Sequence, residues 1–114
     1  GKPGRLRFRQ RSRLVEMYLV KFTKQAAKDA KRLKSAGLDG KARELVAVVA
    51  QDPFGFPPAF EPLVGSLQGM YSRRINRQHR FVYEVVESGI VEGDASYEGI
   101  VKVLSMWTHY ETMK

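Results

Sequence analysis

The sequence predicts one α+β domain in which a helical hairpin packs on a mostly antiparallel sheet. Two helical patterns follow one short β-like run and precede three others, so the expected order is β-α-α-β-β-β. Helices that are segregated from strands along the chain are typical of α+β folds. A length of 114 residues and a hydrophobic content of 43% suit a single compact core.

The first half of the domain is predicted to be one strand followed by two helices. Residues 18–22 are rich in β-forming side chains. A helix is expected from an N-cap at Thr23 to about Ala36, and a second from an N-cap at Asp39 to about Gln51. Glycine follows the first helix and proline follows the second, as is usual where helices end. The short join between them predicts an antiparallel hairpin.

The second half is predicted to be a loop followed by three strands. Residues 53–69 are rich in proline and glycine, which marks an irregular connection. Strands are then expected at 70–75, 79–86 and 100–108. The first two are joined by a tight turn, whereas an acidic linker at 87–99 separates the last two.

The charge of the chain is uneven along its length. The formal net charge is +8, yet between Phe81 and Val101 there are acidic residues and no Lys or Arg. The remaining surface is therefore strongly basic and attracts polyanions such as nucleic acid, although charge also serves solubility. Residues 1–16 form a basic N-terminal extension, which we predict to be separate from a domain at 17–114.

Several protein classes are disfavoured by the composition. The chain has no cysteine and no apolar run of membrane-spanning length. These features predict a cytoplasmic protein without disulfides and without a membrane partner. A metal site is the less favoured alternative, because the chain has only 2 histidines and no thiolate ligand.

The remaining chemistry is acid–base catalysis on a phosphate. RNA carries an internal nucleophile, the 2′-hydroxyl, so its cleavage needs a base, cations for the phosphate and an acid for the leaving oxygen. No cofactor is required for such a reaction. The sequence offers a small set of candidates: Glu61, Arg73, Arg74, Arg80, His109 and Tyr110.

Four short motifs resemble the Txe/YoeB toxins of the RelE/ParE superfamily in their order and approximate spacing. They are Phe60-Glu61-Pro62-Leu63, Ser72-Arg73-Arg74-Ile75-Asn76, His79-Arg80-Phe81-Val82-Tyr83 and Trp107-Thr108-His109-Tyr110-Glu111. The resemblance extends over roughly residues 17–111. It implies a RelE-like fold and a toxin that cleaves messenger RNA in the ribosomal A site.

The resemblance also assigns roles to individual side chains. It implies that Glu61 is the general base and His109 the general acid. Arg80 corresponds to the arginine that stabilises the transition-state phosphate, and Arg74 to a second arginine that contacts phosphate. Tyr110 corresponds to a tyrosine that shapes the site. We further expect Glu61 to be buried against its neighbours Phe and Pro, since burial makes a carboxylate more basic.

The chain departs from the family at Val64, where a lysine is frequent. We expect Arg73 or the basic extension to supply the missing cation. Lys24, Lys28 and Lys31 share one face of the first predicted helix. This repulsive stripe predicts contact with an RNA backbone, with a solvated face as the alternative.

Other conspicuous side chains are interpreted as structural. His79 is expected on the opposite sheet face from Arg80, because strand side chains alternate. Tyr83 and Trp107 are expected to pack in or on the sheet rather than to stack on bases. A structural ion pair between Arg80 and an acid such as Glu84 is the alternative to a catalytic Arg80.

The resemblance implies two macromolecular partners, an acidic antitoxin that quenches the activity and the ribosome with its messenger RNA. It also allows for a homodimer. Two competing functions remain open. One is a toxin of the same fold that binds its target without hydrolysing RNA, as gyrase-directed relatives do, and the other is a plain RNA-binding module. Glu61 and His109 distinguish the nuclease from these two functions, since neither of the two needs a general base or a general acid.

Overall fold

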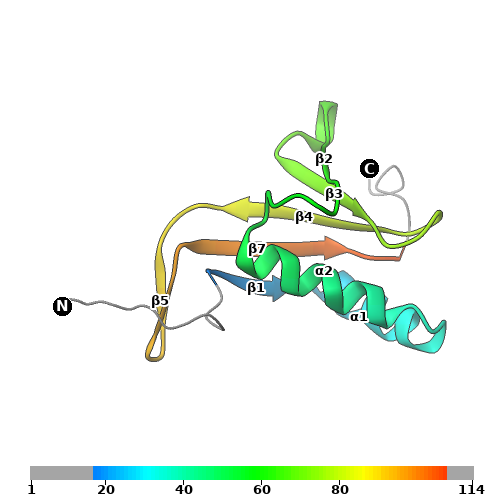
Figure 1. The fold of residues 1–114 in the computed structure, drawn as a ribbon, viewed down its shortest axis with the longest axis horizontal. Helices are drawn as coiled ribbons and strands as arrows, with labels where there is room; N and C mark the ends of the chain where they lie inside the picture. The colour runs from blue at the N-terminus through cyan, green and yellow to red at the C-terminus, as the bar shows by residue number, and fades with distance from the viewer. Residues whose placement is uncertain (1–16, 108–114) are drawn as a thin grey trace.

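The computed structural model describes residues 17–107. Within these residues, two helices and seven strands are arranged in the predicted α+β order, with additional short elements (Figure 1). The helices are α1 (Lys24–Ser35) and α2 (Asp39–Gln51), and a short 3-10 turn, η2, spans Gly65–Leu67. The strands are β1 (Tyr18–Phe22), β2 (Glu61–Pro62), β3 (Met70–Arg74), β4 (Arg80–Val86), β5 (Ile90–Glu92), β6 (Ala95–Tyr97) and β7 (Gly99–Ser105).

The main sheet has the strand order β1-β7-β4-β3-β2. Strand β1 is parallel to β7, whereas the other neighbouring pairs are antiparallel. Both helices lie on one face of this sheet (Figure 1), with α1 against β7 and α2 against β1. The predicted fold class, a helical hairpin on a mostly antiparallel sheet, is confirmed.

Helix α1 begins where the sequence predicts. The Thr23 hydroxyl accepts a hydrogen bond from the Ala26 amide at 3.0 Å and donates one to the Leu104 carbonyl, also at 3.0 Å. This N-cap therefore starts the helix and also attaches its N-terminal end to β7. The predicted N-cap of α2 is wrong by one residue, because Leu38 occupies that position and Asp39 lies in the first turn. No helix among residues 17–107 is both long and apolar enough to cross a membrane.

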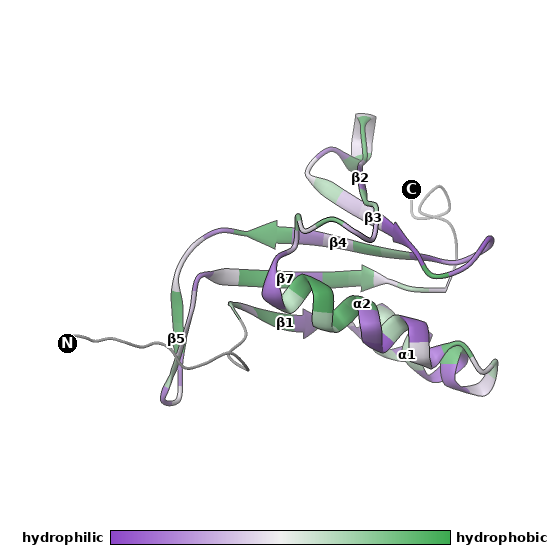
Figure 2. Ribbon diagram, viewed as in Figure 1, coloured by the Kyte–Doolittle hydropathy of each residue, from purple (hydrophilic) through white to green (hydrophobic). Residues whose placement is uncertain are grey.

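The sheet has apolar packing on both faces. The face under the helices holds the larger cluster, which includes Leu33, Leu45, Phe81, Tyr83 and Val103. On the opposite face a smaller cluster forms where the segment after β2 folds over β4: Leu63, Leu67 and Val82. In Figure 2 the central strands β4 and β7 are mostly hydrophobic and the β3–β4 turn is hydrophilic. Part of the second face thus stays open to solvent.

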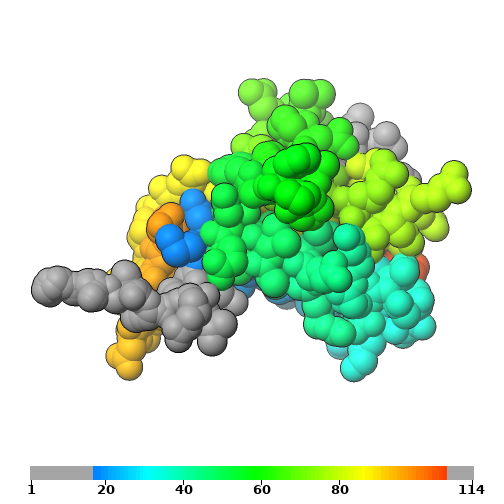
Figure 3. All heavy atoms as spheres, in the orientation of Figure 1, coloured from blue at the N-terminus to red at the C-terminus, as the bar shows by residue number. Residues whose placement is uncertain are grey.

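Two regions predicted as irregular contain regular structure. Residues 61–62 pair with β3 as the edge strand β2. The acidic linker at 87–99 forms a hairpin, β5–β6, which is a separate two-stranded sheet and projects from one end of the molecule (Figures 1 and 3). Gly93 turns this hairpin with a φ of 62°, a conformation that glycine adopts without strain. Glu92, next to this turn, forms an ion pair with β1, because its Oε1 lies 3.6 Å from Nζ of Lys21.

Candidate active site

A pocket of about 200 Å³ opens on the sheet face opposite the helices. Its polar lining consists of Glu61, Ser72, Arg74 and Arg80, with Ala59 and Phe60 as the apolar part. These residues come from the loop before β2 and from three neighbouring strands. The pocket brings together three of the residues that the sequence selected, Glu61, Arg74 and Arg80.

Strand register explains why these side chains meet. Glu61 of β2 is opposite Ser72 of β3, and Arg74 is opposite Arg80 of β4. Because side chains alternate along a strand, Ser72 and Arg74 share one face of β3. Three strands thus deliver one carboxylate, one hydroxyl and two guanidinium groups to the same patch.

Glu61 and Arg80 form an ion pair, with Nη1 of Arg80 3.0 Å from Oε1 of Glu61. The Glu61 side chain is 56% exposed and that of Arg80 is 16% exposed. The expected burial of Glu61 is therefore wrong, since its carboxylate lies at the pocket mouth. Arg80 thus forms an ion pair with an acid, as the structural alternative expected, but the acid is Glu61 and not Glu84, whose Oε2 lies 3.6 Å from Nζ of Lys102.

Two buried donor atoms in this pocket have no hydrogen-bond partner among the described residues. They are the Ser72 hydroxyl oxygen and Nε of Arg80. A buried donor without an acceptor costs about 1–3 kcal/mol, so such groups are rare unless water or a ligand satisfies them. Ser72 and Arg80 both line the pocket, so an oxyanion bound there is one group able to accept from them. The arrangement is suited to holding a phosphate beside a carboxylate base.

Sequence reasoning missed Ser72. Its position two residues before Arg74 was the available signal, because a period of two puts both side chains on one face of β3. A serine in a strand is common, however, and only the structure shows that its hydroxyl is buried without a partner.

Arg73 lies on the other face of β3 and corrects the expectation that it contacts phosphate. It is only 1% exposed. Its guanidinium donates to the carbonyl oxygens of Pro53, Gly55 and Pro58 at 2.9, 3.0 and 2.6 Å. Nε of Arg73 also donates to the Tyr83 hydroxyl at 3.1 Å. Arg73 therefore anchors the loop that leads to the pocket, and it is not available to an RNA phosphate.

The Tyr83 hydroxyl completes this anchor by donating to the Pro53 carbonyl at 2.7 Å. Burial raises the pKa of Tyr83 above its usual value, and the hydrogen bond from Arg73 partly offsets that rise. The anchor matters to the site because the loop that it holds ends in Phe60 and Glu61.

A model of the YoeB-like toxins of bacterial type II toxin-antitoxin systems matches residues 22–110. The chain belongs to this family. A YoeB toxin of Streptomyces coelicolor is 43% identical over 53 residues, covering 46% of this chain and 63% of that toxin. A YoeB toxin of Synechocystis sp. is 40% identical over 47 residues, covering 41% of this chain and 55% of that toxin. The chain thus aligns with less than two thirds of the length of these relatives.

Solved structures agree with the assignment to the YoeB-like toxins. A YoeB/ParE toxin from Agrobacterium tumefaciens superposes with a TM-score of 0.67 at 28% identity, covering 81% of this chain and 99% of that one. YoeB in the YoeB–YefM complex from Staphylococcus aureus superposes with a TM-score of 0.62 at 28% identity, covering 82% of this chain and 98% of that one. A mutant of YafQ from E. coli superposes with a TM-score of 0.61 at 16% identity, covering 85% of this chain and 99% of that one, which shows the shared fold alone.

His109 and Tyr110 fall outside the described residues, as does the predicted extension at 1–16. Val64, at the position where a lysine is frequent in the family, is 81% exposed. Among residues 17–107, no group of three or more histidine, cysteine or acidic side chains is placed to hold a metal ion.

Helix α1 presents a cationic surface. Lys24, Lys28 and Lys31 are all exposed, as predicted from their spacing. The one acid on this helix, Asp29, is 2% exposed, and its carboxylate accepts hydrogen bonds from the Met106 amide and from Gln25. The exposed part of α1 therefore carries positive charge without compensating acids.

His79 has the structural role predicted for it. It is 4% exposed, and its ring stacks on Trp107 with centroids 4.2 Å apart and an interplanar angle of 24°. It directly precedes Arg80, so the two side chains point to opposite faces of the sheet. The stack belongs to the helix side, away from the pocket.

Proposed function

We propose that this YoeB-family toxin is an endoribonuclease that cleaves messenger RNA in the ribosomal A site without a metal or cofactor. The observation that carries the proposal is the pocket in which Glu61 pairs with Arg80 while two buried donors stay unsatisfied. An oxyanion bound in the pocket would satisfy those donors, and the adjacent carboxylate is placed to accept a proton. A phosphodiester with a neighbouring 2′-hydroxyl meets both requirements.

In this mechanism, Glu61 accepts the proton of the 2′-hydroxyl, and the freed oxygen attacks the adjacent phosphorus. The bond from phosphorus to the 5′ oxygen breaks, which leaves a 2′,3′-cyclic phosphate and a 5′-hydroxyl. Arg80 and Ser72 donate hydrogen bonds to the phosphate oxygens as negative charge develops on them. Arg74, exposed at the pocket rim, contacts a flanking phosphate.

The resemblance at the C-terminus supplies the remaining group. His109 donates a proton to the departing 5′ oxygen, for which an imidazole is well suited near neutral pH. Tyr110 shapes the same side of the site. Both assignments rest on the motif Trp107–Glu111.

The proposal includes partners of two kinds. Structures of relatives include a YoeB–YefM complex and a YoeB dimer from Staphylococcus aureus and a DinJ–YafQ complex from E. coli. By analogy, an acidic antitoxin covers the basic surface of this chain, which also forms a homodimer. Ribosomal RNA contacts Lys24, Lys28 and Lys31, and charge reversal at these lysines is expected to weaken ribosome association.

The deciding experiment incubates the protein with translating ribosomes and maps the cut sites on the messenger RNA. Glu61→Gln and His109→Gln are expected to slow cleavage by about 10²–10⁴-fold because each removes a proton-transfer group. The matched control is Glu84→Gln, a carboxylate of β4 that pairs with Lys102. The chelator 1,10-phenanthroline, which removes zinc and other transition metals but leaves the Mg²⁺ of the ribosome in place, is expected not to slow wild-type cleavage. Near-normal cleavage by both site variants would refute the mechanism.

A further inference from the structure

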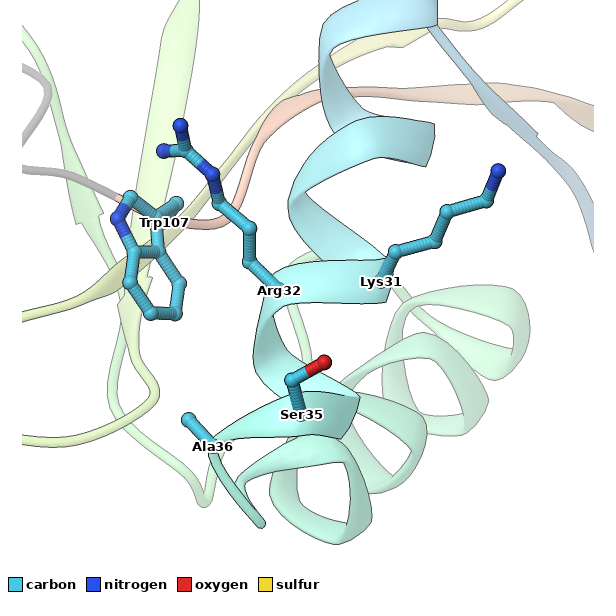
Figure 4. A pocket seen from close by; sticks show the side chains of 5 residues that line it. All are labelled: Lys31, Arg32, Ser35, Ala36 and Trp107. Atoms are coloured by element: carbon cyan, nitrogen blue, oxygen red, sulfur yellow. The ribbon is translucent and has the colours of Figure 1, made fainter.

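A second and larger pocket lies between the C-terminal half of α1 and Trp107 (Figure 4). It is shallow and wide open to solvent, with a volume of about 430 Å³. We call it the Trp107 cleft, and its lining residues are Lys31, Arg32, Ser35, Ala36 and Trp107. Nothing in the mechanism above uses it.

The indole of Trp107 is held as a rigid wall of this cleft. One support is the buried ring of His79, stacked on it at 4.2 Å. The β3–β4 turn fixes that histidine in turn, because the His79 amide donates to the Asn76 side chain at 2.7 Å and the His79 carbonyl accepts from Ile75 at 3.0 Å. A fixed aromatic wall beside a cavity is what binding of a flat ring requires.

The opposite wall is cationic. Arg32 reaches across the cleft, so that its guanidinium carbon lies 5.5 Å from the centre of the Trp107 ring (Figure 4). Lys31 extends from the same turn of α1 but points away from Trp107 (Figure 4). Arg32 forms no ion pair with another residue that the structure describes. Among the described residues, nothing therefore neutralises the Arg32 charge beside the indole.

This combination defines the ligand class. An aromatic face binds any nucleobase by stacking, and an arginine beside it adds a cation–π contact and a phosphate contact. A sugar would use the indole but not the guanidinium, whereas an acidic peptide would use the guanidinium but not the indole. The cleft is suited to one unpaired nucleotide of a single strand.

We propose that the Trp107 cleft binds an unpaired RNA nucleotide, with its base against Trp107 and its phosphate on Arg32. This inference rests on the proposed function, in which RNA is the substrate. His79 and Arg80 are consecutive residues on opposite faces, so the cleft and the Glu61 pocket lie at the same end of the sheet. The strand that is cleaved in the pocket is thus also held outside it.

The test uses the fluorescence of Trp107, the single tryptophan of the chain. The full chain is titrated with a single-stranded RNA oligonucleotide that carries 2′-O-methyl groups, which prevent cleavage. Saturable quenching is expected, and it should weaken as salt rises because phosphate contacts release counterions. Poly-glutamate, a polyanion without bases, is expected to quench far less.

Two variants on α1 make the test specific. Arg32→Ala is expected to weaken the binding roughly fivefold to a hundredfold. Lys34→Ala removes a cation from the same helix that lines a different pocket, and it is expected to bind as the wild type does. Trp107→Leu, followed by anisotropy of labelled RNA, should weaken binding over the same range. Because Arg32 is exposed, its variant remains informative if the Trp107 variant misfolds.

The outcomes separate the two proposals. Equal RNA binding by Arg32→Ala and the wild type would overturn the proposal that the Trp107 cleft binds RNA. Equal quenching by poly-glutamate and RNA would also overturn it and would indicate an acidic peptide as the ligand. Cleavage of unmodified RNA is measured in parallel on ribosomes. Cleavage without RNA-dependent quenching overturns the cleft alone. Saturable quenching without cleavage supports the cleft and overturns the nuclease proposal.

Discussion

Arg73 and Arg80 lie on the neighbouring strands β3 and β4 but on opposite faces of the sheet. Arg73 faces the helix side and is 1% exposed. It donates hydrogen bonds to three backbone carbonyls and to the Tyr83 hydroxyl. Arg80 faces the open side, pairs with one carboxylate and keeps a buried Nε without a partner. The satisfied guanidinium stabilises a loop, whereas the unsatisfied one is available to a ligand.

The comparison predicts the largest effect at Arg80. Arg80→Ala removes a donor to the developing phosphate charge, so cleavage on ribosomes is expected to fall by about 10²–10³-fold. The free energy of unfolding should change by at most about 1 kcal/mol, because the Glu61 pair is partly exposed. Urea denaturation beside the cleavage assay checks both. A large loss of stability would place Arg80 with Arg73 as a structural residue.

Arg73→Ala is expected to have the opposite profile. It leaves buried carbonyls of the 53–58 loop without donors, and we expect a loss of about 3–5 kcal/mol in unfolding free energy. Cleavage, corrected for the folded fraction, should fall much less than for Arg80→Ala. A stable Arg73→Ala protein that fails to cleave RNA would contradict the division between the two faces.

Ser72→Ala sharpens the comparison, because activity and stability should move in opposite directions. The buried hydroxyl has no partner, so its removal is expected to leave stability unchanged or to raise it by up to about 1 kcal/mol. Cleavage should fall about tenfold through loss of one donor to the phosphate, a neutral donor being weaker than an arginine. Ser66→Ala, at an exposed position, is the control. Unchanged cleavage by Ser72→Ala would remove it from the site.

Tyr83→Phe should give the smallest effect, a loss of about 1 kcal/mol in unfolding free energy near neutral pH. The pKa of Tyr83 is raised in the folded state by burial. Its neutral form therefore adds stability that is fully present below the unfolded pKa of about 10 and is lost as pH rises through the folded pKa. The difference in unfolding free energy between the wild type and Tyr83→Phe should therefore become smaller as the pH rises above 9. Urea titrations at several pH values measure this difference. A constant gap would contradict this account.

Local rules were sufficient for much of the fold. Thr23 as a cap, the helix breakers after each helix and the β-rich runs predict the elements to within a few residues. The β5–β6 hairpin was missed because the acidic stretch was interpreted by charge, although Gly93-Asp94 is a two-residue turn signal. The short β2 was missed because a strand of two residues is too short to show an alternation of apolar and polar side chains. Only its pairing with β3 defines it.

The site was harder to predict than the fold. That Glu61 and Arg80 converge depends on strand pairing across 19 positions of sequence, and only the family resemblance indicated it. The burial of Arg73 depends on carbonyls from a loop that lies 15–20 residues earlier in the chain. Alternation along β3 does separate Arg73 from Arg74, so a consistent use of that period predicts different roles for the two arginines.

The most direct test of the central claim compares two lysine substitutions, Arg80→Lys and Arg73→Lys, which keep the charge but remove the guanidinium fork. Unfolding free energy and ribosome-dependent cleavage are measured on the same preparations. We predict that Arg80→Lys is stable and cleaves poorly, and that Arg73→Lys is destabilised while its folded fraction cleaves well. Wild-type cleavage by Arg80→Lys, or loss of cleavage by folded Arg73→Lys, would contradict the assignment of catalysis to the open face.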